Sequence, residues 1–202
     1  MITLYDFLPS GNGYKARLVL KYLEIPYRLV EVDILKGESR TPAYLARNPN
    51  GRIPLLDVPG EGVLAESHAI ISYLAKGSVL IPKDAFQQAL MWQWLCFEQY
   101  NLEPNIATLR FWLRYQKKSK EEIGAAYAEK QAKGYDALRV LETGLAGKKF
   151  LVGDAYSLAD IGLYAYTHGT AGADMSLDAY PGIRAWIKRI EALPRWEPIT
   201  AR

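Results

Sequence analysis

The chain has 202 residues, half of them hydrophobic, and a formal net charge of +3 at pH 7. That size allows one large domain or two small ones with real cores, and we expect two. The slight charge, with Lys117-Lys118 as the one notable basic cluster, argues against nucleic acid binding. The single cysteine, Cys96, excludes an internal disulfide and multi-cysteine metal sites, so we expect no metal.

The beginning of the chain shows no basic-then-apolar signal segment. No apolar run approaches the roughly 18 residues that a membrane-spanning helix needs. We therefore expect a cytoplasmic protein that does not contact a membrane.

Short apolar runs alternate with helical periodicity along residues 1–76, and predict a strand, a helix, a strand, a short helix, a hairpin and a closing helix. This order, a βαβ unit followed by a hairpin and a helix, is that of a thioredoxin-like α/β domain. The expected hairpin turn is Pro59–Gly62. The expected ranges are Ile2–Tyr5, Asn12–Leu23, Tyr27–Val32, Pro42–Arg47, Leu55–Val58, Val63–Ala65 and Ser67–Ala75.

The strand signals end after this region. Residues 77–84 contain glycine, serine and proline, and we interpret them as a linker. Helical periodicity fills the rest, so residues 85–202 are expected to form an all-α domain. Its predicted helices are Phe86–Tyr115, Lys120–Leu145, Ser157–Thr167 and Gly182–Leu193.

The segment Asn48–Asp57 contains Ile53-Pro54 at a strand entrance. Proline lacks a backbone N–H and is confined to a strand's first residue or an edge, which leaves the Ile53 amide and carbonyl for an extended ligand. We expect this bond to be cis, which would turn both groups outward. Glu66 and Ser67 precede a helical run, where a helix start attracts a carboxylate and Glu66 can pair with an ammonium. Both ends of an amino-acid zwitterion fit there.

These motifs resemble the glutathione site of the cytosolic glutathione transferase family, in its bacterial, serine-turn branch. Ile2–Asn12 is similar to the family's first strand and active-site turn, and Ala155–Asp160 is similar to its helix-capping signature near the C-terminus. The resemblance runs along the whole chain. It implies a thioredoxin-like domain followed by an all-α domain, a homodimer, glutathione as co-substrate, and a detoxifying attack of its thiol on a small apolar electrophile.

Ser10 is the expected catalytic residue. It precedes a helix whose free N–H groups and dipole would stabilise a thiolate beside the hydroxyl, which would act as a hydrogen-bond donor. The alternative is that Ser10 only caps the helix. Tyr5 is a rival donor, because other branches of the family place a tyrosine near the end of the first strand, or else it is half-buried packing. Asn12 is either a helper or a turn residue.

The resemblance also implies the glutathione contacts. It assigns the γ-glutamyl group to Glu66 and Ser67, the cysteinyl backbone to Ile53, and the glycine carboxylate to two arginines, which suit a bidentate contact. Taken singly, each residue has a structural explanation: a first-turn charge, a cap or a solvated side chain. His68 stands where the family often has asparagine, and we expect it to face solvent. The full set is Arg40, Arg52, Ile53, Pro54, Glu66 and Ser67.

The electrophile is expected to lie against aromatic and apolar side chains between the domains. Two other functions stay open: a non-catalytic interaction module with the same fold, and a glutathione-dependent isomerase. Disulfide exchange is disfavoured, because the cysteine-using branches carry cysteine where this chain has Ser10. The weak candidates for electrophile contact are Phe7, Leu8, Tyr100, Phe111 and Tyr164.

The spacing of Ser157 and Asp160 predicts a capping box, with Tyr156 stapled onto Ile161. Its expected role is in folding.

Overall fold

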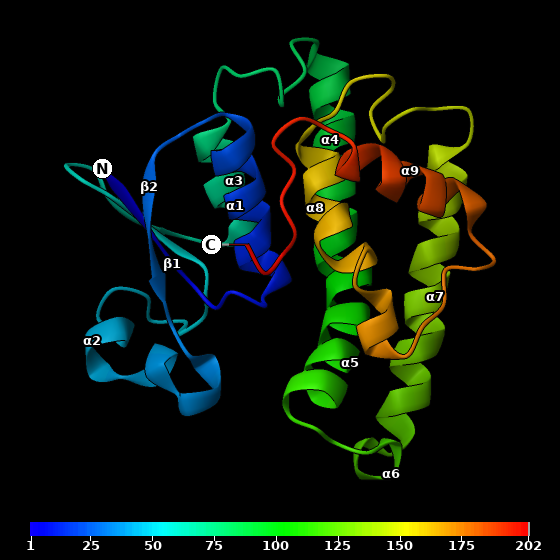
Figure 1. The fold of residues 1–202 in the computed structure, drawn as a ribbon, viewed down its shortest axis with the longest axis horizontal. Helices are drawn as coiled ribbons and strands as arrows, with labels where there is room; N and C mark the ends of the chain where they lie inside the picture. Colours follow the sequence, from blue (N-terminus) through cyan, green and yellow to red (C-terminus); the bar gives the residue numbers. More distant parts are fainter. Residues whose placement is uncertain (202) are drawn as a thin grey trace. The chain divides into compact units, whose positions relative to one another are not determined.

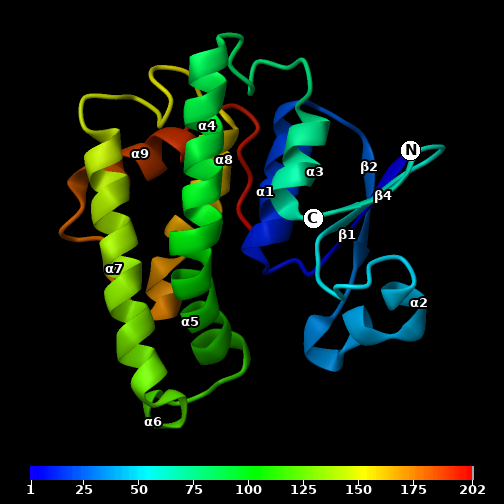
Figure 2. The same ribbon diagram turned by 180° about the vertical axis from the view of Figure 1, so that it is seen from behind.

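The computed structural model describes residues 1–201 and divides them into two compact units (Figures 1 and 2). Unit 1 contains Met1–Ser78 and the tail from Pro194 onward, and unit 2 contains Val79–Leu193. Unit 1 is the expected α/β domain and unit 2 is all-helical, so the predicted fold class is confirmed. No helix within residues 1–201 is long and apolar enough to cross a bilayer.

Unit 1 is built on a four-stranded sheet in the order β2-β1-β3-β4. Strand β1 pairs in parallel with β2 and antiparallel with β3, which pairs antiparallel with β4. Helices α1 and α3 lie side by side (Figures 1 and 2). The elements are β1 (Ile2–Asp6), α1 (Gly11–Tyr22), β2 (Tyr27–Glu31), 3-10 turns at Ile34–Lys36 and Glu38–Arg40, α2 (Pro42–Leu45), β3 (Leu55–Val58), β4 (Gly62–Ala65) and α3 (Ser67–Leu74).

The end of β1 passes closely under α1. Successive side chains of a strand point to opposite faces, so Leu4 and Asp6, both fully buried, share one face and Tyr5 has the other. A Cβ atom added to Gly13 of α1 would lie 1.6 Å from Asp6 Oδ1. Only glycine therefore allows α1 to approach the Asp6 carboxylate this closely.

The tail from Pro194 onward runs along α1, although the sequence pattern predicted that residues 85–202 form one helical domain. Tyr14 donates to the Glu197 carbonyl, and Lys21 Nζ lies 2.5 Å from Glu197 Oε1. Arg17 Nη1 donates to the Ile199 carbonyl at 2.8 Å. These contacts, made by residues nearly the whole chain length apart, place the tail in unit 1.

Two of the helices expected in unit 2 are interrupted. The expected helix Phe86–Tyr115 begins as α4 (Ala85–Phe97) but widens into a π-helical segment, Glu98–Ala107. Pro104 lies inside that segment and lacks the N–H of a regular turn, which accounts for the widening. The expected helix Lys120–Leu145 breaks at Gly124, whose φ of 65° suits glycine. The elements after the π-helical segment are α5 (Thr108–Arg110), a π-helical turn (Phe111–Tyr115), α6 (Lys120–Ile123), α7 (Ala125–Leu145), α8 (Leu158–Thr167), a 3-10 turn (Thr170–Ala173) and α9 (Pro181–Glu191).

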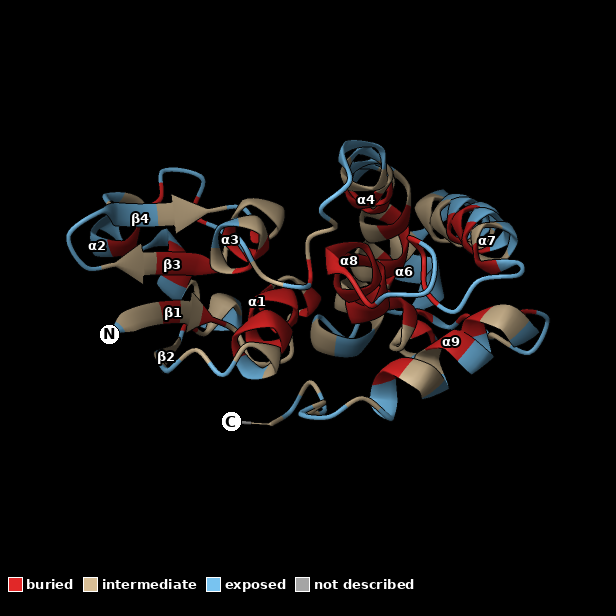
Figure 3. Ribbon diagram, turned by 90° about the horizontal axis from the view of Figure 1, so that it is seen from above, coloured by how far each residue is buried: buried red, intermediate tan, exposed pale blue. Residues whose placement is uncertain are grey.

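Helix α8 is the core of unit 2, and all of its residues are buried (Figure 3). The predicted capping box opens it: Asp160 Oδ2 accepts from the Ser157 N–H at 3.0 Å. The other oxygen, Oδ1, accepts from the Leu151 N–H and from Trp186 Nε1, both at 2.9 Å. Asp160 thus joins α8 to the preceding loop and to α9. Burial raises the pKa of this carboxyl to about 6, against the lowering effect of its hydrogen bonds.

Candidate functional site

Ser10 lies at the N-cap position of α1 with an extended backbone, φ −74° and ψ 130°. Its carbonyl accepts from the Tyr14 N–H at 3.0 Å, which starts the helix, and its own N–H donates to the Phe7 carbonyl at 2.7 Å. The side chain makes no capping hydrogen bond. No acidic residue occupies the first turn of α1, so the positive end of the helix dipole is not neutralised there. The hydroxyl therefore lies at an anion-attracting helix start without serving as its cap.

Tyr5 points to the other face of the sheet. Its ring packs against the cluster formed by Val32, Tyr44 and Leu55, and the Arg47 guanidinium lies 4.2 Å from the ring centroid. This is the packing role that the sequence left open for Tyr5. The geometry gives no support to Tyr5 as a partner of the α1 start.

A polar network joins the beginnings of α1 and α3. Asn12 Oδ1 accepts from Lys15 Nζ at 2.9 Å and from Ser67 Oγ at 3.2 Å. Lys15 Nζ also lies 3.3 Å from His68 Nε2. His68 is half-buried in this network, so the expectation that it faces solvent is corrected. Sequence reasoning missed Lys15, although a lysine one helical turn after Asn12 in an apolar helix was a usable signal.

Glu66 immediately precedes α3 and has φ 70° and ψ 117°. Positive φ is uncommon outside glycine, and such backbone strain concentrates at functional sites. Glu66 is exposed and lies next to the backbone N–H groups of the first turn of α3. A carboxylate and a set of backbone donors thus lie side by side, as the binding of a zwitterion requires.

The Ile53–Pro54 bond is cis, as predicted. Pairing of β3 with both of its neighbours starts at Leu55, so Ile53 lies just outside the paired part of the sheet. The carbonyl of Arg52 is fixed by the Tyr44 hydroxyl at 2.9 Å and by Asn48 Nδ2 at 2.8 Å. The loop is therefore rigid where it approaches Ile53, and the Arg52 side chain is exposed.

Arg40 has a different environment from the one expected of a ligand contact. Its Nη1 donates to the Asn50 carbonyl at 3.0 Å. A Cβ atom on Gly51 would lie 2.5 Å from the same nitrogen. Arg40 therefore braces the loop that leads to Arg52.

The predicted electrophile contacts fall into four environments. Phe7 and Leu8 are half-buried beside Ser10, Tyr100 is 83% exposed, and Phe111 packs against Tyr115 with 6.3 Å between ring centroids. Tyr164 is a correction. It is fully buried on α8, where its hydroxyl donates to Glu191 Oε1 at 3.1 Å and its ring stacks on His168 at 4.8 Å. Its role is packing, because a fully buried ring presents no surface to a ligand.

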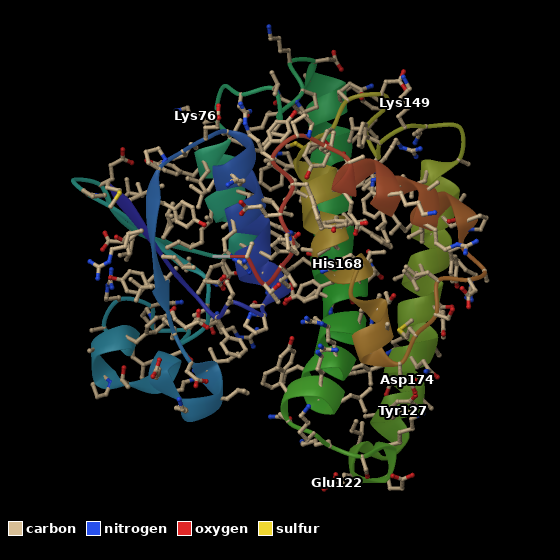
Figure 4. The ribbon with its side chains drawn as sticks, in the orientation of Figure 1. Lys76, Glu122, Tyr127, Lys149, His168 and Asp174 are labelled. Carbon is tan, nitrogen blue, oxygen red and sulfur yellow. The ribbon has the colours of Figure 1, made fainter. Side chains whose placement is uncertain are left out.

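Unit 2 also has an open cleft of about 570 Å³, whose lining includes His168 and Tyr135 but none of the predicted electrophile residues. At its edge Asp174 Oδ2 lies 2.5 Å from both the Tyr127 hydroxyl and Lys120 Nζ, and Figure 4 shows Tyr127 and Asp174 together. Burial lowers the pKa of the His168 side chain, which lines this cleft.

Within residues 1–201, no group of three or more histidine, cysteine or acidic side chains is placed to hold a metal.

The sequence matches two family profiles. Residues 1–76 match the glutathione S-transferase N-terminal domain, and residues 88–194 match the C-terminal domain. A glutathione S-transferase from Pseudomonas fluorescens [Pf-5] is 42% identical, with 99% of each chain covered and a TM-score of 0.96. A Burkholderia graminis glutathione transferase with two glutathione molecules bound per subunit is 30% identical, with 96% of this chain and 85% of that chain covered and a TM-score of 0.85. Disulfide-bond oxidoreductase YfcG of Escherichia coli (strain K12) is 31% identical over 96% of this chain and 92% of its own length.

Proposed function

Since this chain belongs to the glutathione S-transferase family and is a transferase, we propose that Ser10 ionises the thiol of glutathione for attack on a small apolar electrophile. One observation carries the proposal: the Ser10 hydroxyl lies at the start of α1 and makes no capping hydrogen bond. A helix cap would use that hydroxyl for the helix itself. Here it is left to donate to a ligand.

The size of the effect is sufficient for the chemistry. A free thiol has a pKa near 8.5, so only a small fraction is thiolate at neutral pH. A charge-assisted hydrogen bond contributes about 1.5–3 kcal/mol and a helix N-terminus about 0.3–1 kcal/mol. At about 1.36 kcal/mol per unit, the two together lower the thiol pKa by roughly one to three units. The thiol proton leaves to solvent, and the thiolate forms a carbon–sulfur bond as the leaving group departs with its electron pair.

Glutathione itself would be held at three places in unit 1. The carboxylate of Glu66 suits the ammonium of the γ-glutamyl group, and the first turn of α3 suits its carboxylate. The backbone of Ile53, which lies just outside the paired part of the sheet, suits the cysteinyl residue. The exposed Arg52 suits the glycine carboxylate, whereas Arg40 acts through the loop that it braces. The glutathione bound to the Burkholderia relative supports this ligand.

A homodimer in the cytoplasm with a role in detoxification is also proposed. One face of α4 carries large exposed apolar side chains: Phe86 is 69% exposed and Trp92 is 44% exposed. Tyr100, in the π-helical segment that continues α4, is 83% exposed. Side chains of this kind gathered along one helix are typical of a protein contact. A second copy of the chain is the partner that the family favours.

The relative named as a disulfide-bond oxidoreductase suggests a second reaction for the same thiolate. Cys96, the one cysteine, is exposed on α4 rather than placed at the turn. A disulfide substrate would therefore be attacked by the glutathione thiolate, giving a mixed disulfide and releasing the other sulfur as a thiolate. An aryl halide and a small disulfide, assayed side by side, distinguish the two activities. An interaction module would support neither, and an isomerase would convert its substrate without consuming glutathione.

The proposal is tested by following thiolate absorbance of bound glutathione against pH in the parent protein, Ser10→Ala and Tyr5→Phe. We expect Ser10→Ala to raise the bound-thiol pKa by about one to two units, because it removes the hydrogen bond to the thiolate. Conjugation of an aryl halide should slow roughly 10- to 100-fold at neutral pH and partly recover in alkali. Tyr5→Phe is the control and should titrate like the parent. A shift in Tyr5→Phe alone would transfer the role to Tyr5.

A further inference from the structure

Within the turn that carries Ser10, the backbone of Leu8 is held by two side chains from outside the turn. The Leu8 N–H donates to Glu31 Oε1 at 3.1 Å, and the Leu8 carbonyl accepts from Arg17 Nη2 at 2.5 Å. Pro9, the next residue, has no N–H to donate. Of the two side chains that hold Leu8, Glu31 is exposed and Arg17 is buried.

Arg17 is the more constrained of the two. Its Nε donates to Asp6 Oδ2 at 3.1 Å, and its Nη1 donates to the carbonyls of Ile199 at 2.8 Å and Ala201 at 3.3 Å. A guanidinium is a planar fork with fixed donor directions, so these bonds set the position of Nη2 against Leu8. The side chain joins the end of β1, the turn and the tail.

The ion pair with Asp6 holds the Arg17 side chain in place. Asp6 is fully buried, and its carboxylate is confined between Arg17 and the Cα of Gly13. Removing Arg17 from it would leave a buried acid without its opposite charge, which is strongly unfavourable. The buried charge pair therefore favours the observed position of the guanidinium.

We infer that Arg17 is a positioning residue for catalysis: by holding the Leu8 carbonyl, with Asp6 and the tail carbonyls as its anchors, it sets where the Ser10 hydroxyl lies relative to the start of α1. The inference rests on the proposed role of Ser10. A hydrogen bond to a thiolate is sensitive to direction and distance, and a displacement of about 1 Å at a reacting group reduces rates substantially. Arg17 acts through the turn, and the inference requires no contact of Arg17 with glutathione or the electrophile.

The test compares Arg17→Lys with Lys21→Met. Lysine keeps a positive charge beside Asp6 but lacks the fork that reaches Leu8 and the tail together. Lys21 lies one helical turn further along α1 and pairs with Glu197 of the same tail, so its substitution removes a different tail contact and leaves the Arg17 bonds to Ile199 and Ala201 in place. We expect Arg17→Lys to raise the bound-thiol pKa by about one unit and to lower kcat about tenfold, with KM for glutathione within about twofold of the parent. Lys21→Met should leave all three values unchanged.

The thiol pKa in Ser10→Ala and the hydrogen exchange of the turn distinguish a failure of the positioning role from a failure of the proposed function. If Ser10→Ala shifts the thiol pKa and Arg17→Lys does not, the positioning role is wrong while the proposed function stands. If Ser10→Ala has no effect, the proposed function fails, and hydrogen exchange of the peptide spanning Phe7–Asn12 still tests the anchor. Exchange there should be faster in Arg17→Lys than in Lys21→Met. Equal exchange in the two variants, or a loss of thermal stability as the only difference, would overturn the inference. Should Arg17→Lys fail to fold, the double variant Asp6→Asn with Arg17→Met removes the buried charge pair together and is measured in its place.

Discussion

Asp6 is an acid buried in the fold at a position that the proposed chemistry does not use directly. Burial raises its pKa from 3.8 to about 7, while Arg17 acts in the opposite direction and Glu31 adds to the rise. The folded pKa lies above the unfolded one, so between these values the folded state binds more protons than the unfolded state. The free energy of unfolding should therefore fall as the pH rises from about 4 to about 7, and this contribution should be constant above that range.

Asp6→Asn tests this pH dependence, because an amide of the same shape does not titrate. Thermal unfolding of the parent and the variant should be followed at pH 5 and pH 7.5. We expect the parent to lose more stability than the variant between these two pH values. Asp160, whose pKa is raised to about 6, contributes a slope of the same sign to both proteins and cancels in the comparison. Parallel pH profiles would contradict the assignment to Asp6.

The exposed carboxylate of Glu66 predicts an effect on glutathione affinity, and its strained backbone predicts an effect on thermal stability. Glu66→Gln keeps the size of the side chain and removes its charge. Affinity for glutathione should fall by about 1.5–3 kcal/mol, because a charged hydrogen bond to the ammonium is lost. Titration calorimetry measures this directly. Glu66→Gly is the matched control: it should weaken binding equally but unfold at a higher temperature, since glycine accepts positive φ without strain. Unchanged affinity in both variants would show that Glu66 does not contact glutathione.

At the scale of elements, Asp160 joins α8, α9 and the loop before α8. All the polar groups that reach its two oxygens are donors: two backbone N–H groups, the Ser157 hydroxyl and the Trp186 ring N–H. Asp160→Asn would turn an N–H₂ group toward some of these donors. An unsatisfied buried donor costs about 1–3 kcal/mol, so we expect a loss of about 2–4 kcal/mol in the free energy of unfolding. Urea unfolding measures it, and glutathione affinity should be unchanged because the carboxylate belongs to the helical core. Weakened binding at parental stability would be the contrary result.

Local patterns predicted the strands and α-helices of unit 1 to within one or two residues, because strand alternation, the glycine turns and the helix start at Ser10 depend on neighbouring residues. The 3-10 turns at Ile34–Lys36 and Glu38–Arg40 were not predicted. The cis bond before Pro54 followed from the same kind of signal. The π-helical segment Glu98–Ala107 was not predicted, since its apolar spacing is close to that of an ordinary helix and only Pro104 marked it. Gly124 was visible, but a single glycine is compatible with a continuous helix.

The parts of the site that escaped prediction are contacts between distant residues. Lys15 reaches His68 of α3, and Arg17 reaches the carbonyl of Ile199. The position of Lys15 one turn after Asn12 was a local signal for Lys15 itself, but its partner on α3 and the partner of Arg17 in the tail have none, because the fold alone brings these residues together. The prediction for Tyr164 was wrong for a different reason. An aromatic residue in a helical pattern gives the same sequence signal whether it lines a pocket or fills a core.

For the molecule as a whole, the apolar face of α4 predicts the oligomeric state. Trp92 and Phe86 are exposed in the single chain, and a homodimer would bury them. Trp92→Glu would place a charge in that contact, and a buried charge without a partner is strongly unfavourable. We expect the parent to sediment as a dimer and Trp92→Glu to shift towards monomer by at least tenfold in the dimer dissociation constant. Val140→Glu is the matched control, because Val140 is 48% exposed on α7 rather than on α4, and should leave the dimer intact. Analytical ultracentrifugation of the three proteins over a concentration series decides the matter: equal dissociation constants would exclude the α4 face, and a weakened dimer in Val140→Glu alone would move the contact to α7.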